Sequence, residues 1–127
     1  MIEVPISPGE LIDKITILKL KKIFIKNKVQ LKNVNTEFNL LKPLLTKYKL
    51  DTPEINNLFE ELYKINNTLW EIEDKIREKE RETDFGIDFV ELARSVYFTN
   101  DKRSSVKKRI NILSGSKIIE EKSYEDY

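Results

Sequence analysis

The clearest pattern in the chain is a series of apolar residues whose spacing alternates between three and four positions. Its members are Ile55, Leu58, Leu62, Ile65, Leu69, Ile72 and Ile76. This spacing places the side chains on one face of an α-helix, and an unbroken seam over three heptads is typical of coiled-coil packing. Because Thr52 and Pro53 suit the N-cap and first position of a helix, we predict a helix from Pro53 to about Thr83.

A second long helix is predicted to begin near Ile87, after a short turn around Asp84-Phe85-Gly86, and to end at Ser114-Gly115-Ser116. Its stripe of the same spacing consists of Leu92, Val96, Thr99, Arg103, Val106, Ile110 and Leu113. Because the turn is short, the two helices should form an antiparallel, coiled-coil-like hairpin. Two polar residues interrupt the stripe, so either the helix leaves the bundle there or these side chains join a buried network.

The first half of the chain predicts a short extended start over residues 1–7, where apolar and polar residues alternate, and then two more helices. Ser7, Pro8 and Glu10 form a capping box that should start a helix reaching Lys26 or Lys28. A second apolar stripe follows, and Pro43 should kink or divide its helix. With a loose polar tail over residues 115–127, the pattern predicts one all-α domain over 1–127, an antiparallel bundle of about four helices.

Composition narrows the classes of function. Lys and Arg total 23 and Asp and Glu total 22, so the net charge is only +1, and we expect no nucleic-acid partner. The chain has no Cys and no His. This excludes a disulfide scaffold, a zinc site of the Cys/His kind and His-dependent nucleophilic catalysis. Any metal would be a hard ion such as Mg²⁺, held by oxygen ligands.

No apolar run approaches the roughly 20 residues that a membrane span requires. The first residues, Met1 to Ser7, lack the basic and apolar regions of a signal peptide. We therefore expect a protein without a membrane span and with a cytoplasmic location.

Three polar clusters are candidates for chemistry. The first is Glu10, Asp13 and Lys14 in the opening turns of the first helix. The alternative interpretation is structural, because acidic side chains at the N-terminus of a helix interact favourably with the helix dipole. The second lies on one stripe beside the seam and contains Asn66, Trp70, Glu73, Arg77 and Glu80. One interpretation is a pocket between helices in which Arg77 binds an anion beside Trp70. The other is an i,i+4 ion pair of Glu73 and Arg77, with Trp70 covering the edge of the bundle.

The third cluster lies on the last helix and contains Arg94, Tyr97, Asn100, Asp101 and Arg103. Arg77 and Arg94 stand at comparable distances from the turn of the predicted hairpin. We therefore predict that Glu73, Arg77, Arg94 and Tyr97 approach one another across the two helices.

Several of these residues lie in segments that resemble an uncharacterised family of short bacterial helical proteins, a domain of unknown function. The segments are Ser7–Leu18 (SPGELIDKITIL), Leu69–Arg77 (LWEIEDKIR), Glu91–Arg103 (ELARSVYFTNDKR) and Glu120–Tyr124 (EEKSY). The resemblance covers nearly the whole chain and implies a helical fold. It also implies genes near those for surface polysaccharides and glycosyltransferases, an association that assigns no activity.

The leading hypothesis is a non-catalytic helical interaction module that forms a homo-oligomer, because a sustained seam favours partner helices. An alternative is a Mg²⁺-dependent enzyme acting on nucleotides or other phosphorylated substrates. Its metal ligands would be Glu10, Asp13, Glu71 and Asp74, whose two Glu-x-x-Asp pairs look similar in outline to those of all-helical nucleotide pyrophosphohydrolases.

A third hypothesis is a binder of an anionic sugar or nucleotide, which needs no catalytic base and no cofactor. The candidate ligand-binding residues are Lys14, Trp70, Glu73, Arg77, Arg94, Tyr97 and Arg103. Whether the protein is an enzyme stays open at this point.

Overall fold

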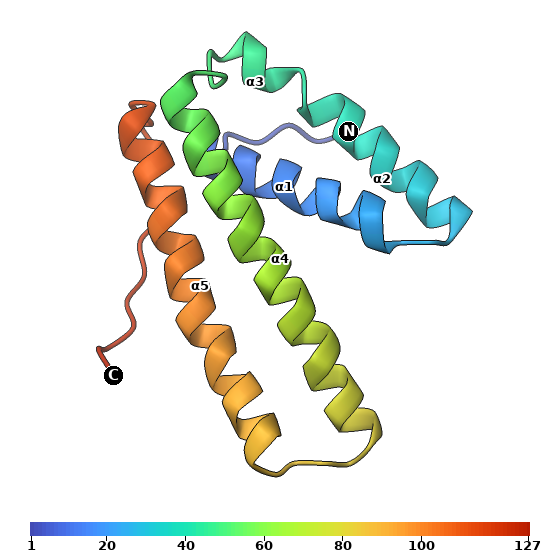
Figure 1. The fold of residues 1–127 in the computed structure, drawn as a ribbon. Coiled ribbons are helices and arrows are strands. Elements are labelled where there is room, and N and C mark those ends of the chain that lie inside the picture. The colour runs from blue at the N-terminus through green and yellow to red at the C-terminus, as the bar shows by residue number, and fades with distance from the viewer.

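A computed structural model describes residues 1–127, and its regular secondary structure consists of helices, without strands. Its helices are α1 (Pro8–Phe24), α2 (Lys28–Leu41), α3 (Leu44–Lys47), α4 (Pro53–Arg81) and α5 (Ile87–Leu113). Figure 1 shows α4 and α5 side by side as one long antiparallel hairpin, and α1 and α2 as a second, shorter pair near the end opposite the α4–α5 turn. The prediction of an all-α bundle built on a long hairpin is confirmed.

Local sequence signals explain where α1 and α4 begin. The Ser7 hydroxyl accepts a hydrogen bond from the Glu10 amide at 3.2 Å, and the Thr52 hydroxyl accepts one from the Ile55 amide at 3.3 Å. Each cap is followed by proline, whose fixed φ suits the first turn. The Glu10 carboxylate does not close the predicted capping box, because it bonds to Lys107 of α5 instead.

Proline and residues in the left-handed backbone conformation (positive φ) set further helix boundaries. Pro43 separates α2 from the single turn of α3, so the predicted division of that helix is confirmed. Gly115, with φ 70°, ends α5 in a Schellman motif, in which the Ser116 amide donates to the Asn111 carbonyl at 2.9 Å. Thr83 ends α4 in the same way with φ 52°, an unfavourable conformation for a β-branched residue.

The core forms where α1 crosses the α4–α5 hairpin. Ile12 on α1, Leu62 on α4 and Ile110 on α5 are each fully buried. Gly9 allows α1 to approach α5 closely, because a Cβ atom there would lie 2.6 Å from the Lys107 carbonyl oxygen. The Gly9 amide instead donates to the buried side chain of Asn111 at 2.7 Å.

The predicted seam is buried only over part of its length. Most of its buried residues lie in the first half of α4, where α1 covers the hairpin, and of those beyond Leu69 only Ile72 is buried. The stripe on α5 ends at Ile110, because Leu113 is 52% exposed. None of the helices combines the length and the apolar character needed to cross a membrane.

The chain before α1 adopts no regular secondary structure. Its apolar residues are exposed, with Ile2 at 89% and Val4 at 65%. The alternating pattern therefore does not reflect pairing within this chain.

Candidate functional site

The most unusual group in the protein is Asp13, a carboxylate on α1 whose side chain is only 2% exposed. Arg103 on α5 contacts both of its oxygens, with Nε donating to Oδ1 at 3.0 Å and Nη2 donating to Oδ2. Asn66 on α4 donates to the same Oδ1 at 2.9 Å. Three helices therefore meet at one buried charge, and a two-point contact between guanidinium and carboxylate is the strongest geometry for such a pair.

Lys107, one turn after Arg103 on α5, extends this group toward the surface. Its Nζ lies 2.8 Å from Oε2 of Glu10 and 3.8 Å from Oδ2 of Asp13. A third carboxylate, Glu120, approaches to 3.3 Å from the chain that follows α5. We call Glu10, Asp13, Asn66, Arg103 and Lys107 the Asp13 cluster.

The Asp13 cluster holds its cations in the protonated form. Burial acts to lower the pKa of Lys107, but the hydrogen bond to Glu10 and the charges of the nearby acids outweigh it, so the pKa lies above its ordinary value. The hydrogen bonds to Asp13 likewise raise the pKa of Arg103. At neutral pH neither side chain has the free electron pair that a general base or nucleophile requires.

The remaining polar atoms around the cluster are also paired. The Asn66 amide also donates to the Thr16 hydroxyl at 2.9 Å, and that hydroxyl donates to the Asp13 carbonyl at 2.7 Å. No buried side-chain nitrogen or oxygen lacks a partner. The sequence left two explanations for the polar residue Arg103 in the α5 stripe, a helix that leaves the bundle or a buried network. The structure shows the buried network.

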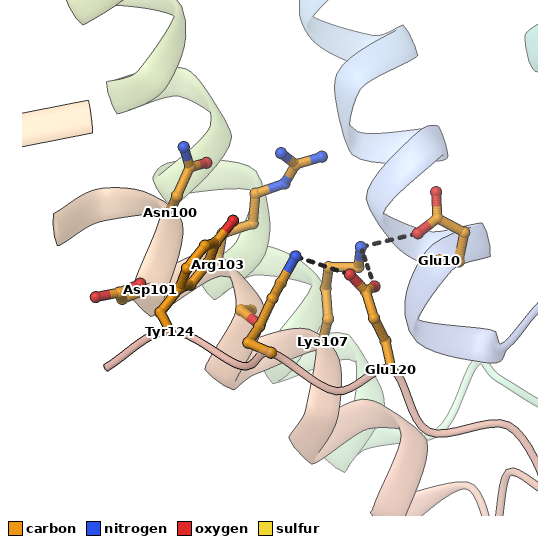
Figure 2. A pocket seen from close by; sticks show the side chains of 9 residues that line it. Glu10, Asn100, Asp101, Arg103, Lys107, Glu120 and Tyr124 are labelled. Atoms are coloured by element: carbon orange, nitrogen blue, oxygen red, sulfur yellow. Dashed lines mark hydrogen bonds and ion pairs between the residues drawn. The ribbon is translucent and has the colours of Figure 1, made fainter. Parts of the chain in front are cut away.

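A cavity of about 400 Å³ opens beside the cluster. Its nine lining residues are Glu10, Asn100, Asp101, Arg103, Ser104, Lys107, Glu120, Lys122 and Tyr124. Figure 2 shows that α5 supplies one side of the cavity, Glu10 of α1 lies at one end, and the chain after α5 passes across it with Glu120 and Tyr124. The cavity is therefore rich in charges, hydroxyls and amides and contains little apolar surface.

The chain after α5 is bound to that helix through its side chains. Glu120 bonds to Lys107 and, at 2.9 Å, to Lys122, and these contacts lower the pKa of the Glu120 carboxyl. The Tyr127 hydroxyl donates to Asp101, which raises the pKa of Tyr127 to about 12. The Tyr127 ring also meets Phe98 edge-on at 4.9 Å. Residues 117–127 thus have no regular secondary structure but line one side of the cavity.

The predicted network between the two halves of the hairpin does not form. Arg77 bonds to Glu73 within α4, and its side chain is 64% exposed. Arg94 bonds to Glu91 within α5 at 3.0 Å. No hydrogen bond or ion pair links the two arginines to the opposite helix, so this prediction is wrong. Each guanidinium pairs with a carboxylate three or four positions away on its own helix, so neither arginine requires a partner on the opposite helix.

The other candidate residues are also dispersed. The Trp70 ring stacks on Phe24 of α1, with the ring centres 5.2 Å apart, and therefore marks the far edge of the α1 contact. Lys14 is exposed on α1. Of the seven candidate ligand-binding residues, only Arg103 lines the cavity.

The two Glu-x-x-Asp pairs are not brought into one group. Glu71 and Asp74 are exposed on α4, whereas Glu10 and Asp13 are engaged by the cations of α5. No group of three or more acidic side chains lies close enough together to hold a metal ion. The acids of α1 serve as partners of Lys107 and Arg103 in this structure.

Sequence reasoning missed the contributions of Lys107, Asn111 and Glu120. Lys107 and Asn111 follow Arg103 at intervals of four on the same helix, so the polar interruption could have been extended along α5. Glu120 offered no such signal, because it belongs to a segment without periodicity.

Comparison with known proteins agrees with the resemblance in the motif segments. No curated protein and no solved structure matches the chain. A family model described as "Family of unknown function (DUF6165)" matches residues 2–127. The chain therefore belongs to this family of unknown function.

Proposed function

We propose that the protein is a non-catalytic helical interaction module that self-associates through the distal half of the α4–α5 hairpin, residues 71–101. The observation that carries the proposal is the incomplete burial of apolar side chains beyond α1, both along the seam and in the turn and first helical turn that follow it. Phe85, Ile87 and Val90 are 53%, 78% and 48% exposed, and Ile76, Phe89, Leu92 and Val96 are only partly buried. We call these seven residues the distal surface.

The partner that fits the distal surface is a second copy of the chain. Ile76, Leu92 and Val96 of the distal surface continue the stripe that α1 buries, so the same kind of helical packing can continue there with helices from another copy. Two such hairpins would form a four-helix bundle. This part of α4 also carries acids and bases in alternation, such as Glu73 with Arg77 and Glu78 with Lys79, which lets an antiparallel copy pair opposite charges.

A non-catalytic role is supported by the way in which the Asp13 cluster uses its charges. The pKa values of Arg103 and Lys107 are raised, and both cations are bound to carboxylates on α1. A closed network of this kind suits a group that fixes the packing of α1 against the hairpin. The Mg²⁺-dependent alternative gains no support from this arrangement.

The test is the mass of the protein in solution. We expect the wild-type chain to be a dimer by light scattering. The double variant Phe85→Asp/Ile87→Asp should be a folded monomer, because two charges would enter the shared apolar surface. The control is Ile112→Asp, which charges an apolar residue that is 65% exposed, between the values for Phe85 and Ile87, at the opposite end of α5 and should leave the dimer intact. A monomeric wild-type chain would overturn the proposal.

A second candidate function is the binding of a small anionic sugar or nucleotide in the cavity. Arg103 and Lys107 supply positive charge there, and Asn100, Ser104 and Tyr124 add amide and hydroxyl groups. Three of the segments that carry the family resemblance, Ser7–Leu18, Glu91–Arg103 and Glu120–Tyr124, each contribute to the lining.

A thermal-shift screen of nucleotides and sugar nucleotides tests this second candidate. A ligand at 100 times its Kd should stabilise the protein by about 2.7 kcal/mol. The variant Ser104→Leu, which fills the cavity without removing a charge, should abolish the shift. A screen without any shift would argue against the cavity and leave the interaction module as the function.

The proposal keeps two further expectations from the sequence. One is a cytoplasmic location. The other is a bacterial source in which the gene lies near those for surface polysaccharides and glycosyltransferases, as the family resemblance implies. A self-associating module in that setting would serve assembly and not chemistry.

A further inference from the structure

The lysines of the protein are concentrated in one segment. Between Asp13 and Glu37 the chain contains seven lysines and no acidic residue. The seven are Lys14, Lys19, Lys21, Lys22, Lys26, Lys28 and Lys32. Because the whole chain has a net charge of only +1, the rest of the molecule is net acidic. The α1–α2 pair is therefore a local cationic region that the overall charge conceals.

No carboxylate of the protein neutralises these lysines. None of the seven takes part in an ion pair. Lys22 lies over the Phe38 ring at 3.7 Å, and Lys19 lies over the Phe59 ring at 5.2 Å. Lys26 donates to the carbonyl oxygen of Ile23 at 3.1 Å. No negative charge of the chain therefore offsets their positive charge, which can attract an external anion.

Apolar side chains are exposed in the middle of this cationic region. Helix α1 ends at Phe24 and α2 begins at Lys28, so the connection between them is a tight turn. Ile23 is 53% exposed and Val29 is 70% exposed, one on each side of the turn. Figure 1 shows the turn at the outer end of the α1–α2 pair, well separated from the α4–α5 turn and from the C-terminus. We call Lys21–Lys32 the basic tip.

We propose that the basic tip binds the surface of a membrane that contains anionic lipids. The lysines would face the phosphates of the lipid headgroups, while Ile23 and Val29 enter the boundary between headgroups and acyl chains. Attraction to anionic lipid and burial of apolar side chains are each weak alone, and peripheral binding normally requires both. The basic tip supplies both within one turn of the chain.

A membrane fits these residues better than the other polyanion that lysines bind, a nucleic acid. Phosphate contacts along a nucleic acid are made by cationic and polar groups. Exposed aliphatic side chains such as Ile23 and Val29 have no partner on a sugar-phosphate backbone, but they have one in a bilayer. The region also contains no arginine, the residue whose planar guanidinium makes two-point contacts with the phosphates of nucleic acids.

Sedimentation with lipid vesicles tests the proposal on the full chain. At about 0.1 M salt, where the Debye length is about 10 Å, the protein should bind vesicles that contain phosphatidylglycerol and not vesicles of pure phosphatidylcholine. The variant Lys21→Gln/Lys26→Gln/Lys28→Gln should weaken binding at least about tenfold, in keeping with the per-lysine contribution to surface attraction. Ile23→Ser/Val29→Ser should also weaken binding, and this loss should persist at low salt.

The matched control is Lys64→Gln/Lys102→Gln/Lys117→Gln, which removes the same charge from exposed lysines outside the basic tip. It should leave binding unchanged, and far-UV circular dichroism should show every variant to be folded. Equal binding to anionic and neutral vesicles, an equal loss in the two triple variants, or tighter binding to duplex DNA than to anionic vesicles would each overturn the proposal.

Discussion

The two halves of the α4–α5 hairpin carry the same apolar spacing but have different surroundings. In the half that α1 crosses, Leu62 and Ile110 are fully buried. In the distal half, Ile76, Leu92 and Val96 of the same spacing are only partly buried, and no third helix covers them. Phe85 and Ile87, in and just after the turn, are 53% and 78% exposed. The difference shows that an apolar seam determines which face of a helix is available for packing. Whether that face is covered within the same molecule depends on where the other helices of the chain lie.

The largest effect is expected when a charge is placed in each half of the hairpin. Leu62→Asp puts a carboxylate into the core that α1 covers, and we expect a loss of at least about 4 kcal/mol in the free energy of unfolding, much of the stability of a small domain. Ile87→Asp should change the stability of the monomer by no more than about 0.5 kcal/mol. Urea unfolding at low protein concentration measures both, and similar losses would show that the halves do not differ.

The second test concerns the Asp13 cluster, which lies only in the half that α1 covers. Arg103→Met removes the two-point contact and leaves the buried Asp13 carboxylate with only the more distant Lys107 as a charged partner, so we expect a loss of about 3 kcal/mol. The double variant Asp13→Leu/Arg103→Met should regain most of it, because an apolar pair can replace a buried ion pair. If the double variant is less stable than Arg103→Met, the Asp13 carboxylate is needed by its other partners, Asn66 and Lys107, and an apolar pair cannot replace the network.

The third test addresses the turn at the end of the distal half. Thr83 has φ 52°, a conformation that glycine adopts without strain. Thr83→Gly should therefore leave the stability unchanged or raise it by up to about 1 kcal/mol, despite the added flexibility of the unfolded chain. The control Glu82→Gly, one position earlier in an ordinary helical conformation, should lower the melting temperature.

The smallest expected effect is at the boundary between the halves, where Tyr127 lies against Tyr97 and Phe98. The hydrogen bond to Asp101 raises the pKa of Tyr127 to about 12. Because this pKa is above the ordinary value of about 10, the contact stabilises the folded state fully below pH 10 and loses this effect as the pH rises toward 12. Ultraviolet titration should show one late tyrosine, and Tyr127→Phe should remove it without changing the others.

The sequence predicted the elements of the fold more reliably than it predicted the site. Caps at Ser7 and Thr52 and the break at Pro43 act within a few residues, so periodicity and local chemistry were enough to locate the helices. The pairing of Asp13 with Arg103 depends on how α1 crosses the hairpin, which no local signal contains. The polar interruption at Arg103 nevertheless marked the place where a buried partner was required.

The wrong prediction of a network across the hairpin has a local physical cause. Glu73, Arg77, Arg94 and Tyr97 were expected to approach one another, but Arg77 pairs with Glu73 and Arg94 pairs with Glu91, four and three positions away on the same helix. In a chain with 35% charged residues, such local pairs form before any contact between helices is needed. Charge clusters on exposed helices are therefore weak indicators of a shared site.

Amide hydrogen exchange at two protein concentrations, one well above and one well below the dissociation constant of the dimer, tests the central claim most directly. If the distal half is the site of self-association, protection of residues 71–101 should increase with concentration, while the covered half of the hairpin should exchange at the same slow rate in both samples. Protection of residues 71–101 that does not depend on concentration would contradict the account.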